Sequence, residues 1–113
     1  MKYIVAIIQP DKLEDVLNLL DQKDIHLVTV TSVMGRGRQK GVSEVYRGHR
    51  EAGSLLRKTK LEIAVNDQFV KVTVDAIRDG ARTGNIGDGK IFVMDLGQCV
   101  RIRTGETDSV AIG

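Results

Sequence analysis

The chain has 113 residues, of which 42% are hydrophobic and only 4% aromatic, so it is expected to form one domain (residues 1–113) with a small aliphatic core. Its net charge of +2 is too mild to indicate a general binder of nucleic acid or membrane surfaces. Cys99 is the one cysteine, which excludes an internal disulfide, and with two histidines it argues against a zinc site. No segment approaches the roughly 20 apolar residues of a membrane span, and the apolar run of MKYIVAIIQP is too short for a signal peptide. We therefore expect a cytoplasmic protein.

The first third of the chain predicts a strand, a helix and a second strand. Residues 3–8 (YIVAII) are continuously apolar, which indicates a strand covered on both faces. Asp11 and Glu14 have the spacing of a capping box at the start of a helix. Residues 26–34 are rich in β-branched side chains and predict the second strand. The apolar stripe of the helix consists of Leu13, Val16, Leu17 and Leu20.

Residues 35–56 (GRGRQKGVSEVYRGHREAGSLL) interrupt this pattern. They show no helical stripe and only a weak strand alternation, and they contain five of the twelve glycines. Structureless segments longer than about 12–15 residues are uncommon in compact domains and are usually functional or disordered. We interpret this segment as a long functional loop.

The rest of the chain repeats the strand–helix–strand order. Residues 59–65 and 90–96 predict strands, and residues 100–103 predict a short fifth one. Asn66 or Asp67 can cap the intervening helix. The order βαβ, loop, βαβ indicates an α+β, ferredoxin-like fold with both helices on one face of an antiparallel sheet. The other face then needs a partner, so we expect a homo-oligomer. The helix is predicted to bury Val70, Val74, Ile77 and Ala81.

Two glycine- and cation-bearing segments suggest an anion site. Glycines at 84, 87 and 89 free backbone N–H groups that can form an anion-binding nest, with Lys90 at its edge. Asp88 fits either a turn residue or an acid beside a ligand, and we favour the turn. Arg101 and Arg103 alternate on the predicted fifth strand, so their guanidinium groups would share one face and form a fork for a polyphosphate. An ordinary turn followed by two solvated arginines would give the same pattern.

Other classes of function have less support. GDGK lacks the GxxxxGK(S/T) spacing of a Walker A loop, and the glycines at 35, 37 and 41 miss the GxGxxG spacing of a dinucleotide site. No evident general base stands in a catalytic context, so an enzyme such as a slow ATPase is not expected. The strands lack the exposed aromatic residues on which RNA bases stack, so nucleic acid is not an expected partner.

With these segments identified, the whole chain resembles the PII signal-transduction proteins, the nitrogen regulators. The resemblance is carried by GRGRQKG (35–41), EVYRG (44–48), TGNIGDGKIFV (83–93) and VRIRTGE (100–106). It implies a compact homotrimer of βαββαβ subunits that binds ATP or ADP in the clefts between subunits. It also implies a T-loop, here about residues 37–55, that docks onto a target, either a membrane transporter or a metabolic enzyme. Any membrane association would be peripheral and would occur only through a transporter.

The resemblance assigns roles to individual positions. The phosphate contacts would come from Gly87, Gly89, Lys90, Arg101, Arg103 and Arg38, and the adenosine pocket from Ile7, Thr29, Gly35, Glu62 and Ala64. Gln39 would help to hold Mg²⁺ beside ATP and 2-oxoglutarate, since a hard cation prefers oxygen ligands. The 2-oxoglutarate site would consist of Gln39, Lys40, Gly41 and Lys58. Gly37 and Asp88 fall within the same nucleotide-binding segments.

The chain departs from the family pattern at several positions. Glu51 occupies the place of the loop-tip tyrosine that is uridylylated in many members, and His49 the place of a serine phosphorylated in others, so neither modification is expected. Gln9 replaces the usual lysine or arginine, and Arg36 replaces a bulky apolar residue. These two positions argue against 2-oxoglutarate binding, whereas Gln39 and Lys58 argue for it. The alternative function is therefore an adenylate-only sensor that regulates transport of another solute.

Overall fold

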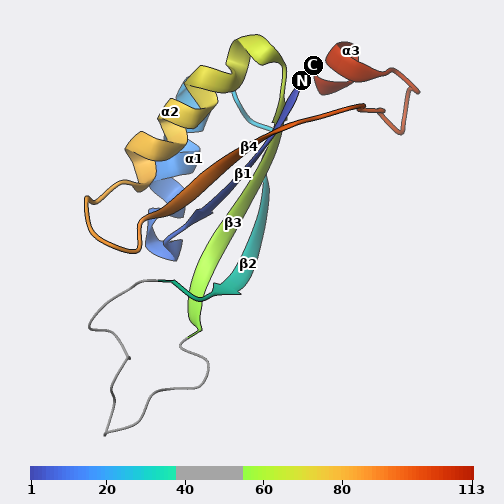
Figure 1. Ribbon diagram of the computed structural model, residues 1–113. Coiled ribbons are helices and arrows are strands. Elements are labelled where there is room, and N and C mark those ends of the chain that lie inside the picture. Colours follow the sequence, from blue (N-terminus) through green and yellow to red (C-terminus); the bar gives the residue numbers. More distant parts are fainter. Residues whose placement is uncertain (38–54) are drawn as a thin grey trace, which may run out of the picture.

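The computed structural model describes residues 1–37 and 55–113. Its elements, in chain order, are β1 (Lys2–Ile8), α1 (Leu13–Gln22), β2 (Thr29–Gly35), β3 (Leu56–Val65), α2 (Val70–Ala81), β4 (Gly89–Asp95) and α3 (Asp108–Ile112). The four strands form one antiparallel sheet in the order β2-β3-β1-β4 (Figure 1). This order and the βαββαβ connectivity confirm the predicted ferredoxin-like α+β fold.

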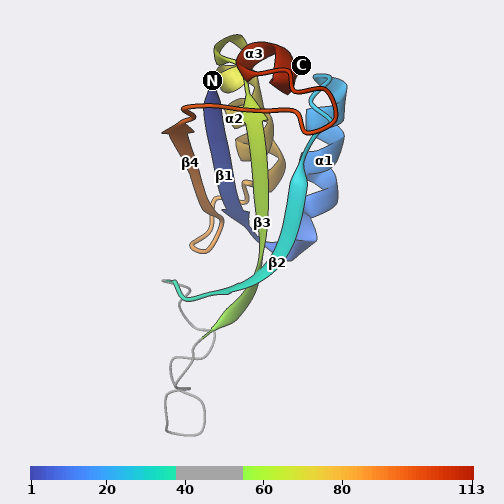
Figure 2. The ribbon, with the colours of Figure 1, turned by 90° about the vertical axis from the view of Figure 1, so that its right-hand side faces the viewer.

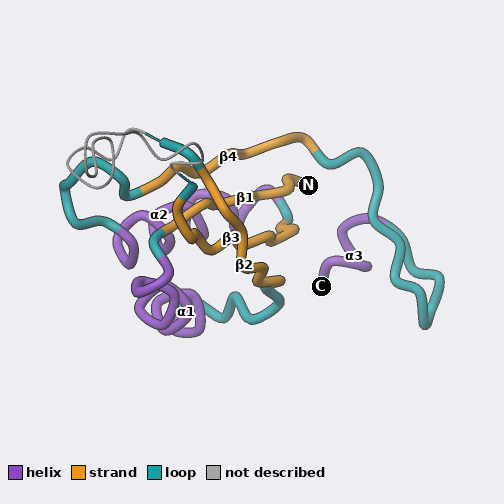
Figure 3. The backbone as a smooth tube through the Cα atoms, turned by 90° about the horizontal axis from the view of Figure 1, so that it is seen from below, coloured by secondary structure: helices purple, strands orange, loops and turns teal. Residues whose placement is uncertain are grey.

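Helices α1 and α2 pack side by side behind the sheet, and Figures 2 and 3 show both on the same face. The opposite face, called here the open face, has α3 in front of one end only (Figure 2). Gly80 of α2 allows the close approach of the two helices, because a Cβ there would lie 2.9 Å from Val16 Cα. The buried core between helices and sheet includes Ile4, Ala6 and Ile8 of β1, Leu61 and Ile63 of β3, Val16 and Leu20 of α1, and Ile77 of α2.

The alternation of side chains assigns each residue of β1 to one face. Ile4, Ala6 and Ile8 are buried against the helices, as the apolar run predicts. The residues between them point to the open face and are only half-buried. On the neighbouring strand β4, Phe92 and Met94 lie opposite Val5 and Tyr3, and they are 46% and 45% exposed. A single chain therefore leaves an apolar strip of its open face in contact with solvent.

Both predicted helix caps are wrong. A 3-10 turn, Pro10–Lys12, precedes α1, and neither its own N-cap nor that of α1 forms a side-chain hydrogen bond. A second 3-10 turn, Asp67–Phe69, stands before α2 in the same way. The polar side chains have tertiary partners instead: Asp67 accepts a bond of 2.8 Å from the N-terminal ammonium, and Asn66 Nδ2 donates to Ser109 O.

The buried face of α2 differs in part from the predicted stripe. Ile77 and Ala81 are buried as expected, whereas Val70 and Val74 are only partly buried against the core. Thr73 is completely buried, and its Oγ1 donates to Phe69 O one turn back at 2.7 Å. This local bond satisfies the hydroxyl, so a polar residue can occupy a core position.

The predicted fifth strand is also wrong. Residues 102–104 form a turn, and the only pairing in this region is an isolated bridge between Val100 and Thr107. The turn is closed by Gly105 N donating to Arg101 O at 2.8 Å and Arg101 N donating to Glu106 O at 2.9 Å. The short helix α3, which the apolar pattern did not predict, follows directly.

Candidate functional site

The connection between α2 and β4 carries the predicted phosphate loop. Gly84, Gly87 and Gly89 all have positive φ, between +91° and +107°, so glycine suits each of these positions. Gly89 has a second reason to be glycine, because a Cβ there would lie 1.8 Å from the carbonyl oxygen of Ile7. The backbone at the start of β4 can thus approach β1, or a ligand, more closely than any other residue type would allow.

Asp88 holds this loop in its shape. Its carboxylate accepts hydrogen bonds from Thr83 N (2.8 Å), Thr83 Oγ1 (2.5 Å) and Gly84 N (2.8 Å). The Thr83 hydroxyl, followed by the backbone donors, lowers the pKa of Asp88 below its ordinary value. The carboxylate thus stabilises the turn, as predicted from the sequence.

Gln9 and Lys58 meet at the same loop. Gln9 Nε2 donates to Gly87 O at 2.9 Å, and Lys58 Nζ lies 3.4 Å from that oxygen. Lys58 is only 7% exposed, and burial lowers its pKa because the charged form loses hydration. Gly35 belongs to this cluster too, since a Cβ at Gly35 would lie 3.3 Å from Lys58 Cγ. The Gly87 carbonyl of the phosphate loop is therefore bonded to Gln9, which directly follows β1, and to Lys58 of β3.

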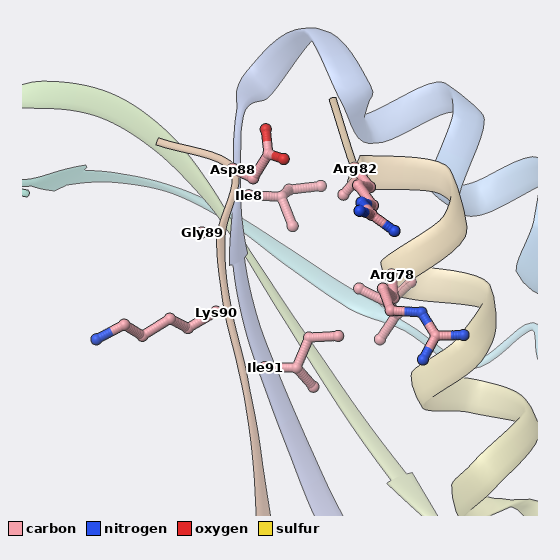
Figure 4. A pocket seen from close by; sticks show the side chains of 9 residues that line it. Ile8, Arg78, Arg82, Asp88, Gly89, Lys90 and Ile91 are labelled. Carbon is pink, nitrogen blue, oxygen red and sulfur yellow. The ribbon is translucent and has the colours of Figure 1, made fainter. Parts of the chain in front are cut away.

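Lys90 points away from the helices. Figure 4 shows Ile91 directed toward α2 and Lys90 on the opposite side of β4, as strand alternation requires. Ile7 lies opposite Lys90 in the β1–β4 ladder, so both belong to the open face. A pocket of about 220 Å³ on the helix side has Arg78, Arg82 and the carboxylate of Asp88 in its lining. Arg78 is paired with Asp75 (3.2 Å), so less of its charge is available to an anion.

A second set of predicted residues lines a pocket at the other end of the open face. Thr29, Glu62 and Ala64 border this pocket, whose volume is about 380 Å³. Thr29 and Glu62 are direct partners in the β2–β3 ladder, so the sheet register brings them together. The sequence reasoning missed the other lining residues, which arrive from β1, from the segment before β2 and from the C-terminal segment; they are Tyr3, Leu27, Val28, Cys99, Ala111 and Ile112.

The two arginines do not alternate on a strand as predicted. The guanidinium of Arg101 donates to Glu106 Oε1 at 3.3 Å and to Ala111 O at 3.1 Å, which anchors the turn to α3. Arg103 is exposed on the same turn, and Ile102 between them is 98% exposed instead of being packed on an opposite strand face. Arg101 and Arg103 both lie in the C-terminal segment, beyond the end of β4.

The predicted nucleotide residues thus fall into two groups. The loop-end group contains Ile7, Gly35, Gly87, Asp88, Gly89 and Lys90, and the α3-end group contains Thr29, Glu62, Ala64, Arg101 and Arg103. At one end of the β1–β4 ladder Gly89 pairs with Ile8, and at the other end Asp95 pairs with Lys2. A strand rises about 3.3 Å per residue, so these two ends lie about 20 Å apart. The phosphate contacts and the adenosine contacts are each divided between the same two ends.

Several predictions concern residues outside the described part of the chain. They are the phosphate contact Arg38, the magnesium ligand Gln39, the 2-oxoglutarate contacts Lys40 and Gly41, and the unmodified position Glu51. Gly37, at the root of the predicted T-loop, is described and exposed. Within residues 1–37 and 55–113 there is no group of three or more His, Cys, Asp or Glu residues that could hold a metal ion. In the same ranges no helix is long and apolar enough to cross a bilayer.

Comparison with known proteins identifies relatives along almost the whole chain. The family model described as Nitrogen regulatory protein P-II matches residues 1–106. Nitrogen regulatory protein P-II 2 of Methanothermobacter thermautotrophicus is 54% identical over 112 residues, which cover 99% of this chain and 97% of that protein. Nitrogen regulatory protein P-II 1 of Escherichia coli K12 is 53% identical over 112 residues, covering 99% of this chain and 100% of the relative. Nitrogen regulatory protein GlnK1 of Methanosarcina mazei is 46% identical over 114 residues, covering 99% and 97%.

Proposed function

This chain belongs to the family of nitrogen regulatory proteins P-II, which are signal-transduction regulators and not enzymes. On that premise we propose that it is a single-domain, cytoplasmic, homotrimeric sensor that binds ATP or ADP between subunits. Its T-loop then docks onto a membrane transporter or metabolic enzyme of nitrogen metabolism. Ligand binding favours one loop shape over another through differential contacts with the loop base.

The division of the candidate site into two groups carries this proposal. One ligand cannot contact Lys90 and Arg103 of the same chain through its phosphates, because β4 separates them. If the loop-end group of one copy meets the α3-end group of the next, the glycine loop, Lys90 and both arginines converge on one phosphate chain. The exposed apolar strip at Phe92 and Met94 favours such an assembly, since burial of apolar surface drives association. A closed ring completes all of its sites in this way.

The residues of the loop-end group suit a phosphate. The positive-φ glycines keep side chains away from the backbone, and Lys90 places an ammonium on the open face. Mg²⁺ would be held by Gln39 together with the phosphates, and when bound it would neutralise phosphate charge. Lys58 lies beside this loop and would pair with a carboxylate of 2-oxoglutarate, whose remaining contacts would come from residues 39–41.

Subunit complementation tests the shared site. Lys90→Met removes a cation from the loop-end group, and Arg103→Met removes one from the α3-end group, so each variant alone should lose most of its ADP affinity. Co-refolded in equal amounts, they should regain about one quarter of the wild-type number of tight sites, because one interface in four pairs two intact ends. Calorimetry counts the sites, and ultracentrifugation verifies the trimer. A mixture with no tight sites would place the site within one chain, and wild type that binds neither ADP nor ATP would refute the function.

Gln9 favours a second candidate, an adenylate-only sensor for the transport of another solute. The neutral side-chain amide of Gln9 donates a hydrogen bond to Gly87 O. A lysine or arginine at this position would instead add a positive charge that could attract a dicarboxylate. Titration of 2-oxoglutarate in the presence and absence of Mg-ATP separates the two candidates. ATP-dependent binding supports the 2-oxoglutarate sensor, and its absence in a chain that binds ATP supports the adenylate-only sensor.

A further inference from the structure

The pocket at the α3 end contains a hydrogen bond to a residue outside the predicted site. Tyr3 Oη donates to Glu62 Oε2 at 2.5 Å. Tyr3 lies opposite Ala64 in the β1–β3 ladder, and Glu62 lies opposite Val5, so the two side chains are diagonal neighbours on the open face. An aromatic side chain can span this diagonal. Both residues also line the pocket.

This bond fixes one oxygen of the Glu62 carboxylate and leaves the other for a further partner. Within residues 1–37 and 55–113, the ion-pair partner of Oε1 is Lys60 Nζ at 3.8 Å, which is longer than a hydrogen bond. The Glu62 side chain keeps 24% exposure, so a ligand can reach it. A carboxylate already held in one orientation loses little conformational entropy when it accepts a hydrogen bond from a ligand.

Tyr3 is a dependable donor across the physiological pH range. The hydrogen bond to Glu62 raises its pKa above the ordinary phenol value, and burial raises it further. Ionised Tyr3 would place a second negative charge against the carboxylate, so the neutral phenol is favoured. The phenol therefore remains protonated and keeps its bond to Glu62.

We propose that Tyr3 is a positioning residue for the nucleoside part of the site. By holding Glu62 Oε2, Tyr3 orients the carboxylate to accept a hydrogen bond from the nucleoside, either from a ribose hydroxyl or from the exocyclic amine of the base. The remaining lining is mostly apolar, and in such pockets a few fixed polar groups determine orientation and specificity. This inference rests on the proposed nucleotide-binding function and adds a residue to it.

A double-mutant cycle tests the role of Tyr3. ADP affinity is measured by calorimetry for the wild type, Tyr3→Phe, Glu62→Ala and the double variant. Tyr3→Phe removes one hydroxyl and should weaken ADP binding about five- to tenfold. The double variant should bind no more weakly than Glu62→Ala alone, because Tyr3 acts through Glu62 and alanine leaves the phenol no acceptor at position 62. Additive losses would refute the proposal, since they would show that Tyr3 acts independently of the carboxylate.

A series of ligands identifies the donor. ADP is compared with 2′-deoxy-ADP, 3′-deoxy-ADP and purine riboside diphosphate, which lacks the exocyclic amine. The loss caused by Tyr3→Phe should disappear for the analogue without the relevant donor, and equal losses for all four ligands would refute the proposal. Thr31→Val is the matched control, because it removes a hydroxyl from β2 outside the pocket and should leave affinity unchanged.

The outcomes also separate this inference from the function on which it rests. Wild type that fails to bind ADP overturns both. Wild type that binds ADP, with Tyr3→Phe binding equally well, overturns only the role of Tyr3. If thermal unfolding shows that Tyr3→Phe is not folded, Glu62→Ala is tested with the same ligands, and an unchanged ranking of the four would refute the proposed hydrogen bond.

Discussion

Replacing Gly89 by alanine should destabilise the fold by disrupting the end of the β1–β4 ladder. A Cβ there would lie 1.8 Å from Ile7 O, whereas a carbon–oxygen contact requires about 3.3 Å. The strands must separate by about 1.5 Å, which breaks one or two hydrogen bonds worth about 1 kcal/mol each. The φ of +103° adds about 1–3 kcal/mol of strain for a residue with a Cβ. The expected loss in the free energy of unfolding is therefore about 2–5 kcal/mol.

Two other glycines separate the contributions. Gly84 has a φ of +91°, but a Cβ added there would have no neighbouring atom within 4 Å, so Gly84→Ala should show the backbone strain alone. Gly97 has neither a positive φ nor a close neighbour, so Gly97→Ala should change stability by less than about 1 kcal/mol. Urea unfolding is followed by far-UV circular dichroism, without nucleotide and at one protein concentration, since oligomers gain stability with concentration. If Gly89→Ala is no more destabilising than Gly84→Ala, the steric argument is wrong.

Two further changes have defined outcomes. Gly80→Ala should lower stability by about 1–3 kcal/mol, because the new methyl group would collide with the backbone of Val16. Alanine favours a helix over glycine, so a stabilised variant in thermal unfolding would contradict the close helix contact. Asp88→Asn should be less stable than the wild type at neutral pH. This difference in the free energy of unfolding should shrink as the pH falls through the lowered pKa of Asp88, because protonation then removes the charged hydrogen bonds of Asp88 from the wild type as well. Urea unfolding of both proteins between pH 7 and pH 3 tests this, and a deficit independent of pH would show that the charge of Asp88 is unimportant.

The order and type of the main elements could be predicted from the sequence. A continuous apolar run marks β1, and strand and helical patterns mark β3, β4, α1 and α2, because these elements bury one face against the same core. The positive-φ glycines of residues 83–89 also follow from sequence, since such backbone conformations strongly favour glycine. The interpretation of Asp88 as a turn residue agrees with its three hydrogen bonds to Thr83 and Gly84.

The errors occur where a residue has a choice of partner. Asn66 and Asp67 have the chemistry of helix caps, but Ser109 O and the N-terminal ammonium lie close to them only after folding. Likewise, alternation at residues 100–103 suits a strand, yet the turn is closed by Gly105 and by Glu106. The local sequence indicates which type of hydrogen bond a residue can form. Which partner lies within reach depends on the tertiary fold.

The sequence alone therefore determined the ferredoxin-like arrangement, the glycine-rich loop segments and the resemblance to P-II proteins, because periodicity and motif spacing are local properties of the chain. Tertiary structure decided which residues share a site. The register of the strands places Lys90 near one end of β4, whereas Arg103 lies in the turn beyond the other end, and it brings Tyr3 to Glu62, residues 59 positions apart in the chain. Such proximities arise from strand pairing over long sequence separations, and no local pattern in the sequence encodes them.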